Sequence, residues 1–216
     1  MKYMGSKRRA AKHIMPIILA ERTEHQCYVE PFVGGCNSIE HVTGWRIGGD
    51  SHKYLMQFWK SFVTGWQPPK DNTEFTESDY NALKLNPDSD PVLAGYAGFN
   101  LAFGAKWFGS FARDSRNDAY VGQAYRHLTK QLPKIWGVQF VHSTYTNLQL
   151  PPNSLIYCDP PYKNATKYKG TTFDHHHFWQ WAKDKANEGH TVYVSEYTAP
   201  EWAIEVWSKP QTTKLH

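Results

Sequence analysis

Short apolar runs alternate with amphipathic segments along most of the chain. Five runs have the length of a buried strand, at 26–29, 45–49, 138–142, 155–158 and 191–194. A sixth run, 203–207, is a candidate for a last strand. Segments that favour helices lie between these runs, at 6–22, 38–43, 51–64, 124–131 and 173–186. Strands that alternate with helices in this way predict an α/β fold.

The alternation stops at residues 68–133, which we interpret as an insertion into an α/β domain formed by 1–67 and 134–216. Within it, glycines, aromatic residues and cations are interleaved in G-Y-A-G-F-N-L-A-F-G-A-K-W-F-G-S-F-A-R-D-S-R, residues 95–116. Aromatic rings beside cations suit stacking on bases and neutralising phosphates. A small aromatic core with charged edges is the alternative, and the pattern leaves both open.

The strand predicted at 155–158 ends in the sequence D-P-P-Y, residues 159–162. Two prolines fix φ and have no N–H to donate, so the turn is stiff and rich in acceptors. It offers the Asp159 carboxylate, the carbonyl oxygens and the Tyr162 ring, which suit an amino group on an aromatic base. A purely structural Pro-Pro turn is the alternative.

Another strand, at 26–29, runs into E-P-F-V-G-G, residues 30–35, before a predicted helix. A loop of this kind lets a ligand approach the backbone closely, because glycine has no Cβ, and it points helix N-terminal amides at the ligand. A simple tight turn explains the same glycine pair.

Asp50 ends the next predicted strand, about twenty residues beyond the first. In nucleotide-binding α/β units an acidic residue at this place accepts hydrogen bonds from ribose hydroxyls. Asp50 is also a candidate N-cap for the helix predicted at 51–64, and the sequence does not separate the two roles.

Composition narrows the class of protein. The 216 residues carry a formal net charge of +4, which is compatible with a polyanionic partner. The three cysteines have no CxxC spacing, which favours a reducing compartment and a cytoplasmic location. The apolar run near the N-terminus is short and holds Pro16, so we expect neither export nor membrane insertion. Three consecutive histidines, 175–177, are read as solvated helix surface rather than as a metal site.

Taken in order, the motifs K-Y-M-G-S-K at 2–7, V-E-P-F-V-G-G at 29–35, Asp50 after a strand, an inserted segment and D-P-P-Y at 159–162 resemble the DNA adenine-N6 methyltransferases of the Dam-like class, the alpha group. The resemblance covers nearly the whole chain and is closest to small, phage-type members. It implies a Rossmann-like sheet that binds S-adenosylmethionine, with a mainly helical insertion that recognises the target sequence in double-stranded DNA.

The resemblance also implies roles for individual residues. The catalytic set is Asp159, Pro160, Pro161 and Tyr162. The cofactor would be bound by Tyr3, Lys7, Glu30, Pro31, Phe32, Gly34, Asp50 and Asp159. Expected DNA contacts are Asn100, Lys106, Arg113, Arg116, Lys163 and Lys167. No metal is expected. The protein is expected to be a monomer or a weak dimer.

Two other functions remain open at this stage. A catalytically inactive DNA-binding relative is suggested by Cys36 in the glycine loop and by a chain that stops at His216, before the closing strand usual in the family. Methylation of an amino group on RNA or protein is the other. Enzymes of that kind more often carry Asn before Pro-Pro-Tyr, so Asp159 favours adenine.

Overall fold

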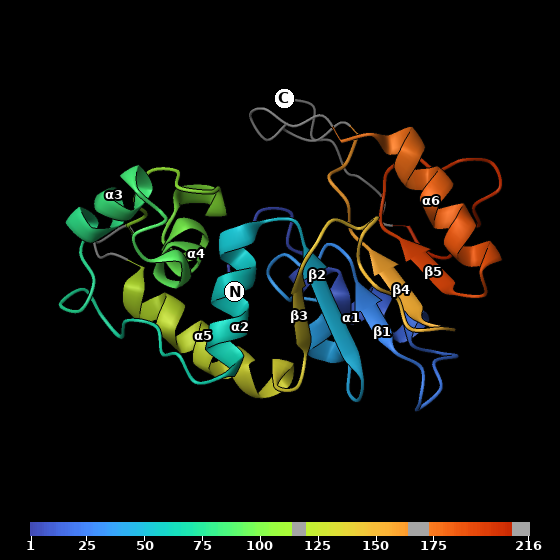
Figure 1. The fold of residues 1–216 in the computed structure, drawn as a ribbon, viewed down its shortest axis with the longest axis horizontal. Coiled ribbons are helices and arrows are strands. Elements are labelled where there is room, and N and C mark those ends of the chain that lie inside the picture. Colours follow the sequence, from blue (N-terminus) through green and yellow to red (C-terminus); the bar gives the residue numbers. More distant parts are fainter. Residues whose placement is uncertain (114–119, 164–172, 209–216) are drawn as a thin grey trace, which may run out of the picture.

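The computed structural model describes residues 1–113, 120–163 and 173–208 and contains one five-stranded sheet. All pairings are parallel, in the order β3-β2-β1-β4-β5 (Figure 1). The strands are β1 Tyr28–Glu30, β2 Arg46–Asp50, β3 Gln139–His142, β4 Leu155–Cys158 and β5 Thr191–Val194. The chain moves outward from β1 in one direction and then returns to add β4 and β5 on the other side, so strand order reverses between β1 and β4. This is a Rossmann-like α/β fold, and it confirms the predicted fold class.

Helices lie around this sheet and beyond its β3 edge. In Figure 1, α6 lies beside β5 at one end, whereas α3, α4 and α5 lie beyond β3 at the other. The α-helices are α1 Ala11–Ile18, α2 Lys53–Val63, α3 Glu77–Leu85, α4 Pro91–Asn100, α5 Val121–Ile135 and α6 His175–Asn187. Single 3-10 turns form η1 Lys7–Arg9, η2 Ile39–His41 and η3 Phe103–Ala105. None of the described helices is long and apolar enough to cross a membrane.

Several predicted elements differ from those observed. Ser6 caps η1 rather than a long helix, and α1 ends at Ile18, short of the expected end near Arg22. The predicted helix at 38–43 is only the 3-10 turn η2. The strand expected at 203–207 is absent from the chain described up to residue 208. Conversely, α5 extends past Gln131 and through Pro133 to Ile135, which is buried.

Two apolar clusters cover the two faces of the sheet. In β1, Tyr28 belongs to one cluster and Val29 to the other, as the alternation of side chains along a strand requires. The larger cluster continues from the sheet through α2 into α4, where the rings of Phe58 and Tyr96 lie 6.1 Å apart. Gly95 allows this close packing, because a Cβ there would lie 2.0 Å from the carbonyl oxygen of Tyr54. The helices of residues 68–133 are therefore fixed to the sheet by a shared core.

Candidate active site

The carboxyl ends of β1, β2 and β4 bring three acidic residues to one edge of the sheet. Glu30 ends β1, Asp50 ends β2, and Asp159 directly follows β4. Because all strands are parallel, these ends point the same way, and the reversal of strand order lies between β1 and β4. In open α/β sheets, ligands bind at this edge and at this reversal.

Asp159 is paired with Lys7, which comes from the other end of the sequence. The Lys7 ammonium lies 2.5 Å from Asp159 Oδ1 and 4.6 Å from the centre of the Tyr162 ring. The Lys7 side chain is 15% exposed and the Asp159 side chain is 23% exposed. Burial raises the pKa of the Asp159 carboxyl, and the nearby Lys7 charge opposes that rise. The site thus joins a carboxylate, a cation and an aromatic ring.

The D-P-P-Y turn places its four residues differently. Pro160 is buried, Pro161 is exposed and Tyr162 is half-buried. The Lys7 ammonium lies over the Tyr162 ring. Burial, together with the neighbouring Asp159 carboxyl, raises the pKa of Tyr162, so its hydroxyl stays protonated at neutral pH. The turn places the Asp159 carboxylate and the Tyr162 ring within reach of the same Lys7 ammonium.

Asp50 holds the glycine loop. One of its carboxylate oxygens accepts a hydrogen bond from Gly34 N at 3.1 Å, and the other accepts from His52 N at 2.9 Å. The N-cap of α2 is His52, whose Nδ1 accepts from Leu55 N at 3.3 Å. The alternative that Asp50 caps this helix is therefore wrong. Burial raises the pKa of Asp50, and the two backbone donors oppose the rise.

The backbone conformation and the close neighbours at position 34 require a glycine. Its φ is +46°, in the left-handed region, and a Cβ there would lie 2.7 Å from Cε1 of Tyr3. The Tyr3 ring lies against the loop on this side, and Trp59 Nε1 donates to the Gly34 carbonyl at 2.9 Å. The structure thus brings the K-Y-M-G-S-K segment onto the glycine loop.

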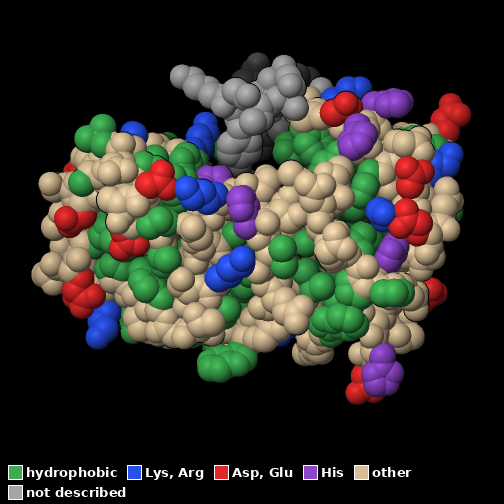
Figure 2. Space-filling model, in the orientation of Figure 1, with side chains coloured by type: hydrophobic (Ala, Val, Ile, Leu, Met, Phe, Trp, Pro, Cys, Tyr) green, Lys and Arg blue, Asp and Glu red, His purple; other side chains and the backbone are tan. Residues whose placement is uncertain are grey.

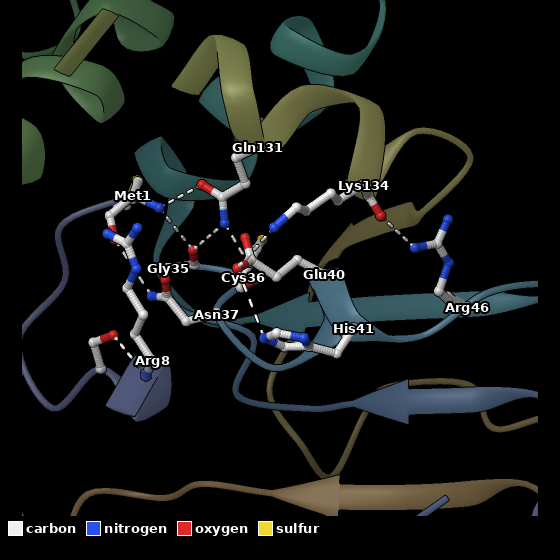
Figure 3. Close-up of polar contacts among 11 residues, drawn as sticks. Met1, Arg8, Gly35, Cys36, Asn37, Glu40, His41, Arg46, Gln131 and Lys134 are labelled. Carbon is white, nitrogen blue, oxygen red and sulfur yellow. Dashed lines mark hydrogen bonds and ion pairs between the residues drawn. The ribbon is translucent and has the colours of Figure 1, made fainter. Parts of the chain in front are cut away.

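The same loop is held from α5 by a residue that the sequence reasoning did not single out. Gln131 Nε2 donates to the carbonyls of Gly35 at 3.1 Å and Cys36 at 3.2 Å, as Figure 3 shows. The amine of Met1 in turn donates to Gln131 Oε1, and Asn37 Nδ2 donates to the Met1 carbonyl at 3.4 Å. A glutamine on the buried face of an amphipathic helix was the available signal, because buried amides need partners.

Glu30 is the most deeply buried acid of the three. It is 3% exposed and accepts a hydrogen bond from the Tyr28 hydroxyl at 2.7 Å. Burial raises the pKa of Glu30 to about 8, the Tyr28 hydrogen bond lowers it, and the nearby Asp159 carboxyl adds to the rise. The i, i+2 spacing on one face of β1 was the sequence signal for this pair. Of the other loop residues, Pro31 is buried, and the Phe32 ring lies 5.5 Å from Tyr145 in an aromatic cluster.

The residues expected to contact DNA are placed unequally. Asn100 is 1% exposed and donates to the Tyr96 carbonyl at 2.9 Å, a position that does not suit direct contact with DNA. Lys106 and Lys163 are exposed, and Arg113 is exposed while paired with Glu77 at 2.9 Å. Arg116 and Lys167 lie outside the described residues. On the face shown in Figure 2, basic, acidic and apolar side chains are interspersed.

A hollow of about 400 Å³ lies beside this site without including its acids. Its wall is formed by the N-terminal segment and the loop around η3: Met1, Lys2, Tyr3, Ser6, Arg8, Ala102, Phe103, Gly104, Ala105 and Tyr120. Asp159 and Tyr162 are not in that wall, so this hollow and the acidic edge are neighbours that share only the 1–8 segment. Among the described residues, no group of three or more His, Cys, Asp or Glu side chains is arranged to hold a metal ion.

Comparison with known protein families gives a match that covers most of the chain. The model of a family described as D12 class N6 adenine-specific DNA methyltransferase matches residues 3–209. A search of curated proteins found no match. The matched range spans the sheet, the inserted helices and the D-P-P-Y turn.

Proposed function

Because the chain belongs to the D12 class of N6 adenine-specific DNA methyltransferases, we propose that it transfers a methyl group from S-adenosylmethionine to N6 of an adenine rotated out of duplex DNA. The observation that carries the proposal is the placement of Asp159 and Tyr162 at the carboxyl edge of the sheet, next to the reversal of strand order. A carboxylate and an aromatic ring in one stiff turn suit a planar base that bears an amino group.

The chemistry of the acidic edge fits the methyl donor. S-adenosylmethionine supplies a methyl group on a positively charged sulfonium sulfur, and it also carries an ammonium and ribose hydroxyls. Asp50 and Asp159 offer this edge acceptors for cations and hydroxyls, and Glu30, whose pKa is raised to about 8, lies beside them in its protonated form. We assign cofactor binding to the set predicted from sequence: Tyr3, Lys7, Glu30, Pro31, Phe32, Gly34, Asp50 and Asp159.

The acceptor nitrogen needs activation by the protein. The lone pair of adenine N6 is delocalised into the ring, so the nitrogen is a poor nucleophile until acceptors hold its hydrogens. We assign this role to the Asp159 carboxylate and the Pro160 carbonyl. Asp159 also stabilises the positive charge that develops on N6, and it offers a place for the proton that N6 releases. Positioning supplies much of the remaining acceleration.

Lys7 keeps Asp159 ready for this role. A buried carboxyl tends to be protonated, and a protonated Asp159 would accept hydrogen bonds poorly. The Lys7 ammonium, 2.5 Å away, favours the ionised form. We therefore assign Lys7 an electrostatic role in addition to closing the cofactor site.

Access to N6 requires that the base leave the duplex, since its edge is otherwise occupied by pairing. We assign Tyr162 as the ring on which the rotated adenine stacks. Residues 68–133 are assigned to recognition of the DNA sequence. Their exposed cations Lys106 and Arg113, together with Lys163 after the D-P-P-Y turn, are assigned to neutralising phosphates. The shared core between α2 and α4 supports this, because it fixes the insertion relative to the catalytic edge.

The test is incorporation of labelled methyl groups into duplex DNA, with RNA and a protein mixture as parallel acceptors. Wild type should label DNA only, and Asp159→Ala should reduce labelling by roughly 100-fold or more. Asp184→Ala, which changes an exposed acid on α6, should behave as wild type. Labelling of RNA or protein instead of DNA would contradict the proposal. So would binding of cofactor and DNA by wild type without any transfer.

A further inference from the structure

Three consecutive residues after β5 contact the D-P-P-Y turn or the strand that carries it. The first, Ser195, extends the pairing of β4 and β5 by one step, because its N–H donates to the Cys158 carbonyl at 2.9 Å. Its hydroxyl lies 2.8 Å from the hydroxyl of the buried Tyr157. The backbone that leads into Asp159 is thus tied to the end of β5.

The next two residues contact the other end of the turn. Glu196 Oε1 accepts a hydrogen bond from Lys163 N, the residue directly after Tyr162, at 3.0 Å. The Tyr197 ring lies 4.8 Å from the Tyr162 ring, at an interplanar angle of 75°. Edge contacts of this kind favour one orientation of a ring pair. Tyr162 is therefore held by its backbone and by its ring from the same segment.

The partly buried carboxyl of Glu196 lowers the stability of the fold. Its second oxygen, Oε2, is buried and has no hydrogen-bond partner among the described residues. Burial raises the pKa of the Glu196 carboxyl, the Lys163 N–H lowers it, and the nearby Asp159 adds to the rise. A buried acceptor without a partner lowers stability, so folding alone does not account for an acid at this place.

We propose that Glu196 and Tyr197 are positioning residues for the methyl transfer, which act by fixing the orientation of Tyr162. This inference rests on the proposed function. Glu196 sets the backbone after Tyr162 through the Lys163 amide, and Tyr197 holds the ring through its edge. Misplacement of a reacting group by about 1 Å costs on the order of 100-fold in rate, so a platform held on two sides aligns the acceptor nitrogen.

The test compares conservative and disruptive variants at each position. Glu196→Gln keeps an oxygen that accepts from Lys163 N, and Tyr197→Phe keeps the ring, so both should stay within about threefold of wild-type kcat. Glu196→Ala and Tyr197→Ala should each lower kcat roughly 10-fold to 100-fold. The Kd for S-adenosylmethionine should change by less than about threefold. Glu205→Ala, which changes an exposed acid later in the chain, should behave as wild type.

The decisive measurement is a double-mutant cycle with Tyr162→Ala. If Glu196 and Tyr197 act through Tyr162, adding Glu196→Ala or Tyr197→Ala to Tyr162→Ala should lower kcat by less than about twofold. Losses that multiply would overturn the inference, as would wild-type kcat in both alanine variants. Should Glu196→Ala fail to fold, Tyr197→Ala still decides, since Tyr197 is 62% exposed. Transfer by wild type that is abolished in Asp159→Ala keeps the proposed function intact whichever way this cycle falls.

Discussion

The Lys7 ammonium lies 2.5 Å from the Asp159 carboxylate, although 152 positions separate the two residues in the sequence. Lys7 begins the 3-10 turn η1, which Ser6 caps by accepting a hydrogen bond from Arg8 N at 3.2 Å. The pair joins the first motif of the chain to the D-P-P-Y turn. Under the proposed function, this pair links the N-terminal segment to the carboxylate assigned to the acceptor nitrogen.

Replacing Lys7 should therefore alter the pH dependence of catalysis. In Lys7→Met the pKa of Asp159 rises further, because burial is no longer opposed by a cation. The acid limb of kcat/KM should move to higher pH, and the rate at neutral pH should fall roughly tenfold or more, with partial recovery at alkaline pH. The check is to measure pH–rate profiles of wild type, Lys7→Met and the control Lys12→Met, which changes an exposed cation on α1. An unchanged acid limb would show that Lys7 does not tune Asp159.

Much of the fold can be predicted from the local pattern of apolar and polar residues. The strands β4 and β5 were predicted to the residue, because four-residue apolar runs bounded by polar turns define them. The helical spacing of the apolar residues Leu55, Phe58, Trp59 and Phe62 also predicts the buried face of α2, and all four are buried. Short turns were less predictable. The segment at 38–43 forms only one 3-10 turn, since the β-branched Ile39, Val42 and Thr43 favour helices weakly and Val42 is already extended, with ψ 141°.

The candidate site was predictable where it depends on strand ends. Asp50 and Asp159 could be placed at one edge because parallel strands deliver their carboxyl ends together. Contacts across elements were not predictable in the same way. Gln131 on the glycine loop and Glu196 on the Lys163 amide depend on how distant segments pack, and neither residue belongs to a motif. Lys7 was expected near the cofactor, and its pairing with Asp159 was not foreseen.

Stability should fall as the pH rises through the range in which Glu30 ionises. The pKa of Glu30 is about 8 in the folded protein against 4.5 ordinarily, so the folded state binds the proton more tightly than the unfolded state. The stabilising contribution is complete below pH 4.5 and is lost as the pH approaches 8. Glu30→Gln, which cannot ionise, should remove this part of the pH dependence.

Urea unfolding at pH 5 and pH 9 tests this expectation in both proteins. The stability difference between the two pH values should be larger in wild type than in Glu30→Gln, by on the order of a few kcal/mol. Glu205→Gln, an exposed acid, should titrate as wild type does. Equal pH dependence in wild type and Glu30→Gln would contradict a buried, largely protonated Glu30.

Gly34→Ala should damage cofactor binding more than an equally strained alanine elsewhere. Gly34 and Gly44 both have positive φ, +46° and +76°, so alanine at either pays a backbone cost of roughly 1 kcal/mol. Only at Gly34 does the new Cβ meet a ring, 2.7 Å from Tyr3, whereas at Gly44 the nearest atom is 3.6 Å away. Calorimetry should show S-adenosylmethionine affinity reduced roughly tenfold or more in Gly34→Ala and unchanged in Gly44→Ala. Similar affinities in the two variants would separate Tyr3 and Gly34 from the cofactor site.

The central claim is transfer of a methyl group to adenine N6 in DNA at Asp159. It is tested most directly by sequencing modified adenines in a host that lacks adenine methylation, after expression of wild type or Asp159→Ala. We predict N6-methyladenine in one defined sequence context with wild type, and none above background with Asp159→Ala at equal levels of folded protein. Unmodified DNA in cells that contain folded wild type, or equal modification by both proteins, would contradict the account.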